Sequence, residues 1–175
     1  MERDLERDVR ALLDKEAIRE CFLRYTRGID RLDVDMIKSA FHEDAIDNHA
    51  RGVQGSIDDM LRWWLPQQPS RDATQHFVTN QTIELDGDSA HVETYFLVII
   101  KQKAREDAAL IGGRYADRFE RRKGTWRIAL RVVLPEWQAD LDARGTELVR
   151  QGAAVHGARD PSDVTYQRPL RNPSS

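Results

Sequence analysis

Short turns divide the second half of the chain into long β-rich segments, and this pattern limits the folds that the sequence can adopt. The turns lie at Leu85-Asp86-Gly87-Asp88 and at Arg122-Lys123-Gly124. An Asp-Gly pair between two runs of β-branched and aromatic residues is a strong hairpin signal. The pattern predicts an antiparallel meander of four strands, over residues 77–85, 89–103, 108–121 and 125–134.

Apolar residues in the first part of the chain recur at spacings of three and four, which is the period of an amphipathic helix. They predict a helix over residues 4–31 whose buried stripe consists of Leu5, Val9, Leu12, Leu13, Ile18, Phe22, Tyr25 and Ile29. Asp33 is a suitable N-cap for a second helix over residues 34–41, and Pro66 closes a third over residues 56–65. A short strand is expected over residues 45–49. Helices followed by a meander form an α+β arrangement.

The composition is that of an ordinary globular domain. The chain has 175 residues and a net charge of −3, from 27 basic and 30 acidic side chains. This balance lacks the excess of basic residues that a nucleic-acid-binding face requires. The longest apolar stretch, residues 96–100, is too short to span a bilayer, and the charged N-terminus does not resemble a signal peptide. Cys21 is the single cysteine, so we expect no internal disulfide. Together these features predict a cytoplasmic protein without nucleic-acid partners or membrane partners.

The C-terminal part of the chain has a weaker pattern than the rest. After Pro135 the hydrophobic periodicity fades, and Pro161, Pro169 and Pro173 interrupt the last residues. We therefore predict a domain over residues 1–137 and an irregular arm over residues 138–175.

Candidate chemistry is sparse, because the usual phosphate-loop, zinc-protease and serine-hydrolase motifs are absent. The segments His42-Glu43-Asp44 and Asp47-Asn48-His49 concentrate possible metal ligands. Their spacing matches no known ligand pattern, and a polar loop between a helix and a strand explains them better than a metal site does. We predict no metal site.

Four other polar residues stand out, each with an ordinary structural explanation. Asp30 lies at the C-terminal end of the first helix, where a carboxylate opposes the helix dipole. It could act as a catalytic group, or it could pair with a neighbouring arginine. His76 begins the first long strand, Tyr25 belongs to the apolar helix stripe, and Arg131 interrupts the last strand on the face opposite Trp126 and Ile128. Taken alone, these three fit a polar strand residue, a core aromatic and a solvent-facing arginine.

Several segments together resemble the SnoaL-like branch of the nuclear-transport-factor-2 superfamily. The resembling segments are residues 18–33, 41–45, 74–80, 87–95 and 112–120, in that order. The resemblance implies an NTF2-like cone, in which a curved antiparallel β-sheet is wrapped by three N-terminal helices around a deep apolar pocket. Within this branch the chain is most similar to cofactor-free lyases such as bile-acid 7α-dehydratase and hexachlorocyclohexane dehydrochlorinase, and more distantly scytalone dehydratase.

The resemblance also implies a catalytic set consisting of Asp30, His76, Tyr25 and Arg131. In this expectation Asp30 orients His76, which removes a proton from carbon. Tyr25 or Arg131 then donates hydrogen bonds to the leaving group or to a developing enolate. The residues that we expect to contact an apolar ring-bearing substrate are Trp63, Trp64, Tyr95, Phe96 and Asn48.

The function implied by the resemblance is a cofactor-independent lyase, most simply a dehydratase of a steroid, polyketide or aromatic alcohol. Loss of halide, double-bond isomerisation and deformylation of a lignin-derived diaryl compound use the same early proton removal, so they stay open. A non-catalytic ligand-binding protein and the small subunit of a ring-hydroxylating dioxygenase are alternatives from other classes. The resemblance further implies a homo-oligomer, with a trimer favoured over a dimer and the C-terminal arm at the subunit interface.

Overall fold

The computed structural model describes residues 4–49, 53–103, 105–144 and 147–171. Within them lie the helices α1 (Leu5–Arg31), α2 (Val34–Ser39), α3 (Ile57–Trp64) and α4 (Glu147–Arg150), and the short 3₁₀ helices η1 (Leu65–Ser70) and η2 (Val164–Tyr166). The strands are β1 (Phe41–Asn48), β2 (Gln54–Gly55), β3 (Arg71–Asp86), β4 (Ser89–Gln102), β5 (Asp107–Arg122) and β6 (Thr125–Asp142). The α+β class is therefore confirmed.

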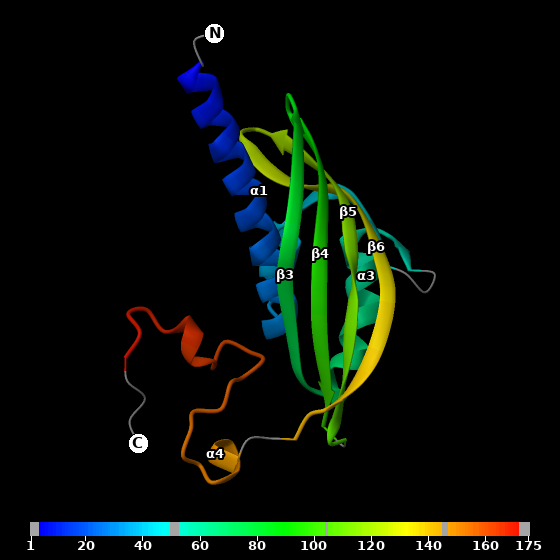
Figure 1. Ribbon diagram of the computed structural model, residues 1–175, viewed down its shortest axis with the longest axis vertical. Coiled ribbons are helices and arrows are strands. Elements are labelled where there is room, and N and C mark those ends of the chain that lie inside the picture. Colours follow the sequence, from blue (N-terminus) through cyan, green and yellow to red (C-terminus); the bar gives the residue numbers. More distant parts are fainter. Residues whose placement is uncertain (1–3, 50–52, 104, 145–146, 172–175) are drawn as a thin grey trace.

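One six-stranded sheet organises the molecule, in the order β2-β1-β6-β5-β4-β3. The long strands β3 to β6 form the predicted antiparallel meander, while β1 pairs with β6 in parallel. The sheet curves, with α1 beside β3 and α3 behind the sheet (Figure 1). At the β5–β6 hairpin, both Lys123 and Gly124 have positive φ, which is the geometry of the tight turn that matches the twist of two strands.

The first helix has the predicted length, but its apolar stripe is buried only in its second half. Ile18, Phe22, Tyr25 and Ile29 belong to the core. The N-terminal members of the predicted stripe, Leu5, Val9, Leu12 and Leu13, are exposed, because this half of α1 leans away from the strands (Figure 1). The prediction of one continuous buried stripe is wrong for these four residues.

Several predicted boundaries differ from the structure. The second helix ends at Ser39, and Phe41 already begins β1, so the helix predicted over residues 34–41 is too long. β3 begins at Arg71, ahead of the predicted start at residue 77, and β6 continues to Asp142, past the predicted boundary of the arm at residue 137. Polar strand ends pair well with neighbours but carry little hydrophobic signal, so periodicity does not detect them.

A β-bulge changes which face of the sheet the residues of β6 occupy. The pairing of β5 with β6 shifts at Ile128, which places Ala129 out of register. Trp126 and Ile128 are buried as expected, but beyond the bulge the buried face carries Arg131. The predicted placement of Arg131 on the face opposite Ile128 is therefore wrong.

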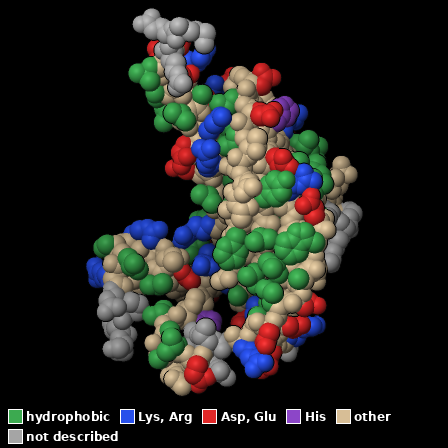
Figure 2. Space-filling view, in the orientation of Figure 1, with side chains coloured by type: hydrophobic (Ala, Val, Ile, Leu, Met, Phe, Trp, Pro, Cys, Tyr) green, Lys and Arg blue, Asp and Glu red, His purple; other side chains and the backbone are tan. Residues whose placement is uncertain are grey.

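The outer face of the sheet carries an apolar patch that we define as Phe77, Leu97, Tyr95 and Leu134. Cross-strand pairing places Phe77 beside Leu97, and Arg114 between Tyr95 and Leu134. Phe77, Tyr95 and Leu134 are exposed. Figure 2 shows hydrophobic side chains gathered over the strands on this side of the molecule.

Among the described residues, none of the helices is long and apolar enough to cross a membrane.

Candidate active site

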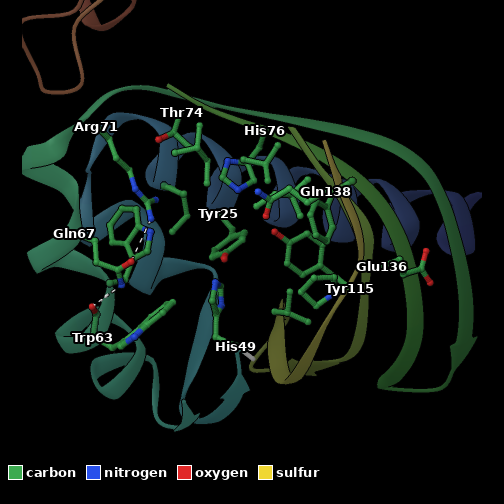
Figure 3. A pocket seen from close by; sticks show the side chains of 18 of the residues that line it. Tyr25, His49, Trp63, Gln67, Arg71, Thr74, His76, Tyr115, Glu136 and Gln138 are labelled. Carbon is green, nitrogen blue, oxygen red and sulfur yellow. Dashed lines mark hydrogen bonds between the residues drawn. The ribbon is translucent and has the colours of Figure 1, made fainter. Parts of the chain in front are cut away.

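A cavity of about 470 Å³ opens between the concave side of the sheet and the helices α1 and α3. Its lining combines apolar walls with a small set of polar groups, which is typical of a small-molecule site. The lining residues are Tyr25, Ile29, His49, Trp63, Trp64, Gln67, Arg71, Thr74, His76, Phe96, Val98, Ile100, Ile111, Tyr115, Val133, Pro135, Glu136, Trp137 and Gln138. Figure 3 shows the side chain of Glu136 pointing away from the others.

His76 and Asp30, the two residues predicted to form a dyad, are in direct contact. Nδ1 of His76 lies 2.7 Å from Oδ1 of Asp30, and the backbone N–H of His76 donates to Oδ2 at 2.9 Å. The two side chains are 9% and 16% exposed. The contact links the last turn of α1 to β3, so both the sheet and the helix fix its geometry.

The hydrogen bond determines which nitrogen of His76 can act as a base. A carboxylate only accepts hydrogen bonds, so the hydrogen of a neutral ring lies on Nδ1. Nε2 then carries the lone pair. Because the His76 side chain lines the cavity, this arrangement presents a general base to a bound molecule.

Two tyrosines lie deep in the same cavity. Tyr25 and Tyr115 are almost fully buried, and their rings meet edge to face with centroids 6.2 Å apart. Burial raises the pKa of both phenols well above the ordinary value. Tyr115 raises the pKa of Tyr25 further, and the nearby carboxylates of Asp117 and Asp47 raise the pKa of Tyr115. Both hydroxyl groups therefore remain protonated at neutral pH and can donate hydrogen bonds.

Arg131 lies behind the tyrosines and does not line the cavity. It forms a two-point ion pair with Asp117, at 2.8 and 2.6 Å, and both side chains are completely buried. Its guanidinium carbon lies 4.3 Å from the ring centroids of both Tyr25 and Tyr115. Burial alone would lower the pKa of Arg131, but the adjacent Asp117 carboxylate outweighs it and raises the pKa. The structure therefore corrects the predicted position of Arg131: it supports the two tyrosines from behind.

The residues predicted to contact a substrate divide into two groups. Trp63, Trp64 and Phe96 line the cavity. Tyr95 and Asn48 lie outside the lining, and this corrects their predicted position. Successive residues of a strand point to opposite faces, so Tyr95 and Phe96 cannot both face the cavity. Tyr95 points outward, with Arg114 over its ring at 5.8 Å. Asn48 lies between Asp47 and His49, which both face inward, so the same alternation directs the Asn48 side chain away from the cavity.

These inward-facing neighbours of Asn48 form a second histidine–carboxylate pair, which the sequence analysis did not identify as catalytic. Nδ1 of His49 lies 3.1 Å from Oδ1 of Asp47, and His49 lines the cavity. The spacing of Asp47 and His49 could have revealed this pair, because residues two positions apart on an extended chain point to the same face.

The possible metal ligands of residues 42–49 are not brought together. Nε2 of His42 contacts the carbonyl oxygen of Glu120 at 2.9 Å, whereas His49 faces the cavity. In the described part of the chain, no group of three or more His, Cys, Asp or Glu side chains is arranged to hold a metal ion.

Comparison with known families places this site in context. The SnoaL-like domain matches residues 10–132, which is most of the chain. The chain belongs to the SnoaL-like domain family. The matched segment of this SnoaL-like domain contains Asp30, His49, His76, Tyr115 and Arg131. A search of curated proteins finds no matching relative.

Solved structures share the fold of this SnoaL-like domain at low sequence identity. A putative scytalone dehydratase from Novosphingobium aromaticivorans is 19% identical, with a TM-score of 0.69, covering 78% of this chain and 93% of that one. A type 2 hexachlorocyclohexane dehydrochlorinase (LinA) is also 19% identical, with a TM-score of 0.71 and coverage of 79% and 97%. A protein of unknown function from Mycobacterium tuberculosis is 24% identical, with a TM-score of 0.61 and coverage of 73% and 74%. At these identities the likeness shows the NTF2-like cone fold.

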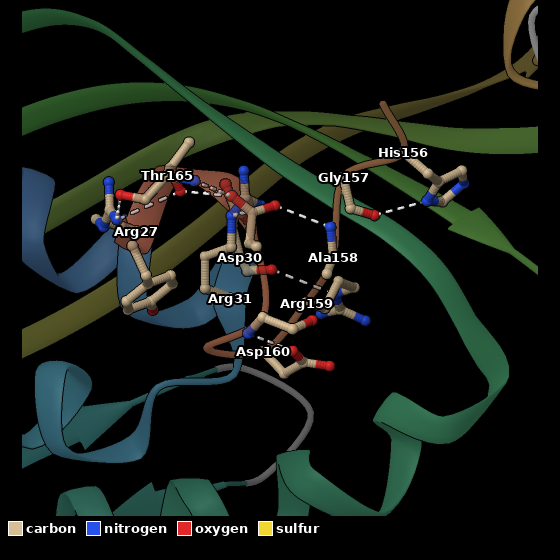
Figure 4. A network of polar contacts seen from close by, with 12 residues as sticks. Arg27, Asp30, Arg31, His156, Gly157, Ala158, Arg159, Asp160 and Thr165 are labelled. Atoms are coloured by element: carbon tan, nitrogen blue, oxygen red, sulfur yellow. Dashed lines mark hydrogen bonds and ion pairs between the residues drawn. The ribbon is translucent and has the colours of Figure 1, made fainter. Parts of the chain in front are cut away.

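The C-terminal arm of this SnoaL-like domain contacts its own chain beside the dyad. Nε of Arg159 donates to the backbone carbonyl of Asp30 at 3.3 Å, and its Nη2 donates to the side chain of Gln68 at 3.0 Å. Further along the arm, Arg27 donates to the carbonyl oxygen of Thr165 at 3.3 Å (Figure 4). The arm therefore packs against the end of α1 that carries Asp30. Its predicted location at a subunit interface stays a prediction.

Proposed function

We propose that this protein is a cofactor-independent lyase that eliminates a small group, most simply water, from an apolar ring-bearing alcohol. The observation that carries the proposal is the contact between Asp30 and His76 at the wall of an apolar cavity. Such a pair can remove a proton from carbon without a redox or electrophilic cofactor, provided that the carbon is acidified by a neighbouring carbonyl or ring.

In the proposed step, Nε2 of His76 takes a proton from the carbon next to the one that carries the leaving group. The electron pair of that C–H bond becomes the new C=C bond, and the bond to the leaving group breaks. Asp30 stabilises the imidazolium that forms on His76. The hydroxyl groups of Tyr25 and Tyr115 donate hydrogen bonds to an oxygen of the substrate where negative charge develops.

The names of the structural neighbours support the reaction type. A dehydratase and a dehydrochlorinase both eliminate a small group, and both share this fold. We take the common reaction class as the proposal for this chain. Water is the preferred leaving group because His49 also lines the cavity and is a polar group that suits a departing oxygen.

The walls of the cavity support a ring-bearing substrate. Trp63, Trp64 and Phe96 present flat apolar surfaces, and Val98 and Ile100 extend the wall along β4. A volume of about 470 Å³ is within the range of pockets that hold drug-sized molecules. Steroid, polyketide and aromatic alcohols all fit this description.

The test of the proposed function is mass spectrometry of the purified protein with a panel of hydroxylated steroids, polyketide alcohols and diaryl propanoids, without added cofactor. The proposal predicts that at least one compound loses the mass of water. Loss of formaldehyde would instead indicate a deformylating lyase, and rearrangement without mass change would indicate an isomerase. Compounds that are retained but never converted would contradict catalysis and favour a binding protein.

We also propose that the protein assembles into a homo-oligomer, for which a trimer is the preferred form. The support is the outer-face patch that contains Phe77, Tyr95 and Leu134, since exposed apolar side chains gathered on one face commonly mark a protein interface. Light scattering coupled to size exclusion measures the mass directly. A monomer at micromolar concentration would contradict the proposal.

A further inference from the structure

The structure contains a second histidine–carboxylate pair that the proposed proton abstraction does not use. His49 follows β1 directly, and its Nδ1 is held by Asp47. Asp47 is completely buried, and among the described residues its second oxygen, Oδ2, has no hydrogen-bond partner. A buried carboxylate needs a compensating partner, and the His49 ring is within hydrogen-bond distance.

The two histidines reach the cavity from different sides. His76 lies on β3, at one edge of the sheet, whereas His49 follows β1, near the other edge. Figure 3 shows the two rings directed into the same space, with the ring of Tyr25 between them in this view. Because Asp30 and Asp47 each occupy the Nδ1 side of one ring, both rings present Nε2 to the cavity.

An elimination from an alcohol requires two different proton transfers. One group must accept a proton from carbon, and another must supply a proton to oxygen, because hydroxide is a poor leaving group. Tyr25 and Tyr115 are weak candidates for the second role, since burial raises the pKa of both phenols. An imidazole gives up and regains a proton near neutral pH far more readily.

We propose that His49 is the general acid that protonates the departing oxygen, with Asp47 as its positioning residue. This inference rests on the proposed function and adds the second half of its chemistry. The protonated His49 donates its Nε2 hydrogen as the C–O bond breaks, so that water leaves and His49 becomes neutral. His76 holds the proton taken from carbon. It releases that proton to solvent, and His49 regains one from solvent, which restores the starting state.

The test compares two substrates that differ only in the leaving group: a β-hydroxy ketone that bears a phenyl ring, and its β-chloro counterpart. Both yield the same conjugated enone, whose absorbance is followed. Chloride needs no proton to leave. We therefore expect His49→Gln to lower kcat for the hydroxy ketone by about 10²-fold or more, and to change kcat for the chloro ketone by only a few fold.

Two further variants complete the design. His76→Gln removes the base and should lower kcat for both substrates by similar factors. His42→Gln is the matched control, because His42 lies on β1, the strand that directly precedes His49, but contacts the carbonyl of Glu120 outside the cavity. It should leave the ratio of the two rates unchanged. Circular dichroism confirms that each variant is folded.

The outcomes are distinguishable. Equal losses for both leaving groups in His49→Gln would overturn the role of His49 and leave the proposed function intact. Unchanged rates for both substrates would also overturn it. If the wild-type protein converts neither substrate and no compound of the panel above, the proposed function fails, and this inference fails with it.

Discussion

Asp30 holds His76 at two points: one carboxylate oxygen lies 2.7 Å from Nδ1 of the ring, and the other accepts the backbone N–H at 2.9 Å. The same side chain therefore fixes the position of the strand and the orientation of the imidazole. A carboxylate at the C-terminal end of a helix opposes the helix dipole. The two hydrogen bonds from His76 compensate for this placement.

Replacing Asp30 with Asn should separate these two roles. An amide oxygen can still accept the backbone N–H, but the amide nitrogen would favour the wrong tautomer of His76. We expect Asp30→Asn to lower kcat by about 10²–10⁴-fold, as for an orienting acid, with little change in melting temperature. Asp35→Asn, an exposed position on α2, is the control. Retention of full activity in Asp30→Asn would contradict the dyad.

The Arg131–Asp117 pair should be essential for stability. Both side chains are completely buried, so removing one leaves the other charge without compensation. Arg131→Met should destabilise the fold by about 3–5 kcal/mol in urea unfolding. The exposed pair between Arg122 and Asp44 is the control, and Arg122→Met should leave the urea unfolding curve close to that of the wild type. Equal effects of the two substitutions would contradict the structural role of Arg131.

Gly113 lies on β5, opposite Pro135 of β6, where the β6 backbone leaves no room for a side chain. A Cβ atom there would lie 2.3 Å from the carbonyl oxygen of Leu134 and 3.0 Å from the ring of Phe96, which lines the cavity. We expect Gly113→Ala to destabilise the protein by about 1–3 kcal/mol. In Gly157→Ala the new atom would meet only an ordinary contact at 3.7 Å, so its unfolding curve should match the wild type.

The local structure of the docked C-terminal arm should depend on pH through Asp163, whose hydrogen-bond partners lie within the arm. Hydrogen bonds from the hydroxyl and the backbone N–H of Thr165, together with the backbone N–H of Ala158, lower the pKa of Asp163 to about 2. Because the pKa is lowered, Asp163 stabilises the docked form when the pH is above the ordinary aspartate pKa of about 4. This stabilisation is lost as the pH falls toward 2. Limited proteolysis between pH 2 and 5 should show cleavage in the arm only at the acidic end.

A variant tests the same interaction at neutral pH. Asp163→Ala removes the acceptor for Thr165 and the partner of Arg31, so it should expose the arm to protease at neutral pH as well as between pH 2 and 5. Asp160→Ala, which alters an exposed carboxylate nearby, should not. Equal protease resistance of wild type and Asp163→Ala would contradict the proposed anchoring.

Much of the fold can be predicted from the sequence, because its signals are local. The helical period of residues 18–29 and the two glycine turns define α1 and the meander. The exposed start of α1 could not be predicted, since Leu5 and Leu12 continue the apolar period into the part of the helix that leans away from the sheet. Periodicity detects an apolar face but does not show whether a partner covers it.

The candidate site is less predictable, because its geometry depends on contacts between distant segments. Family resemblance pairs Asp30 with His76, and no local rule would do so. The bulge at Ala129 reverses the face of Arg131, which simple alternation along the strand misplaces. Alternation does explain why Tyr95 faces away from the cavity, and it would have drawn attention to Asp47 and His49 together.

The most direct test of the central claim is to measure the rate of elimination by the wild type and by His76→Ala. The substrate is used with and without deuterium at the reacting carbon. The account predicts that wild-type protein converts the phenyl-bearing β-hydroxy ketone more slowly when this carbon carries deuterium. It also predicts that His76→Ala is slower by about 10²–10⁴-fold. A variant that keeps the wild-type rate, with the same isotope effect, would show that another group removes the proton and would contradict the account.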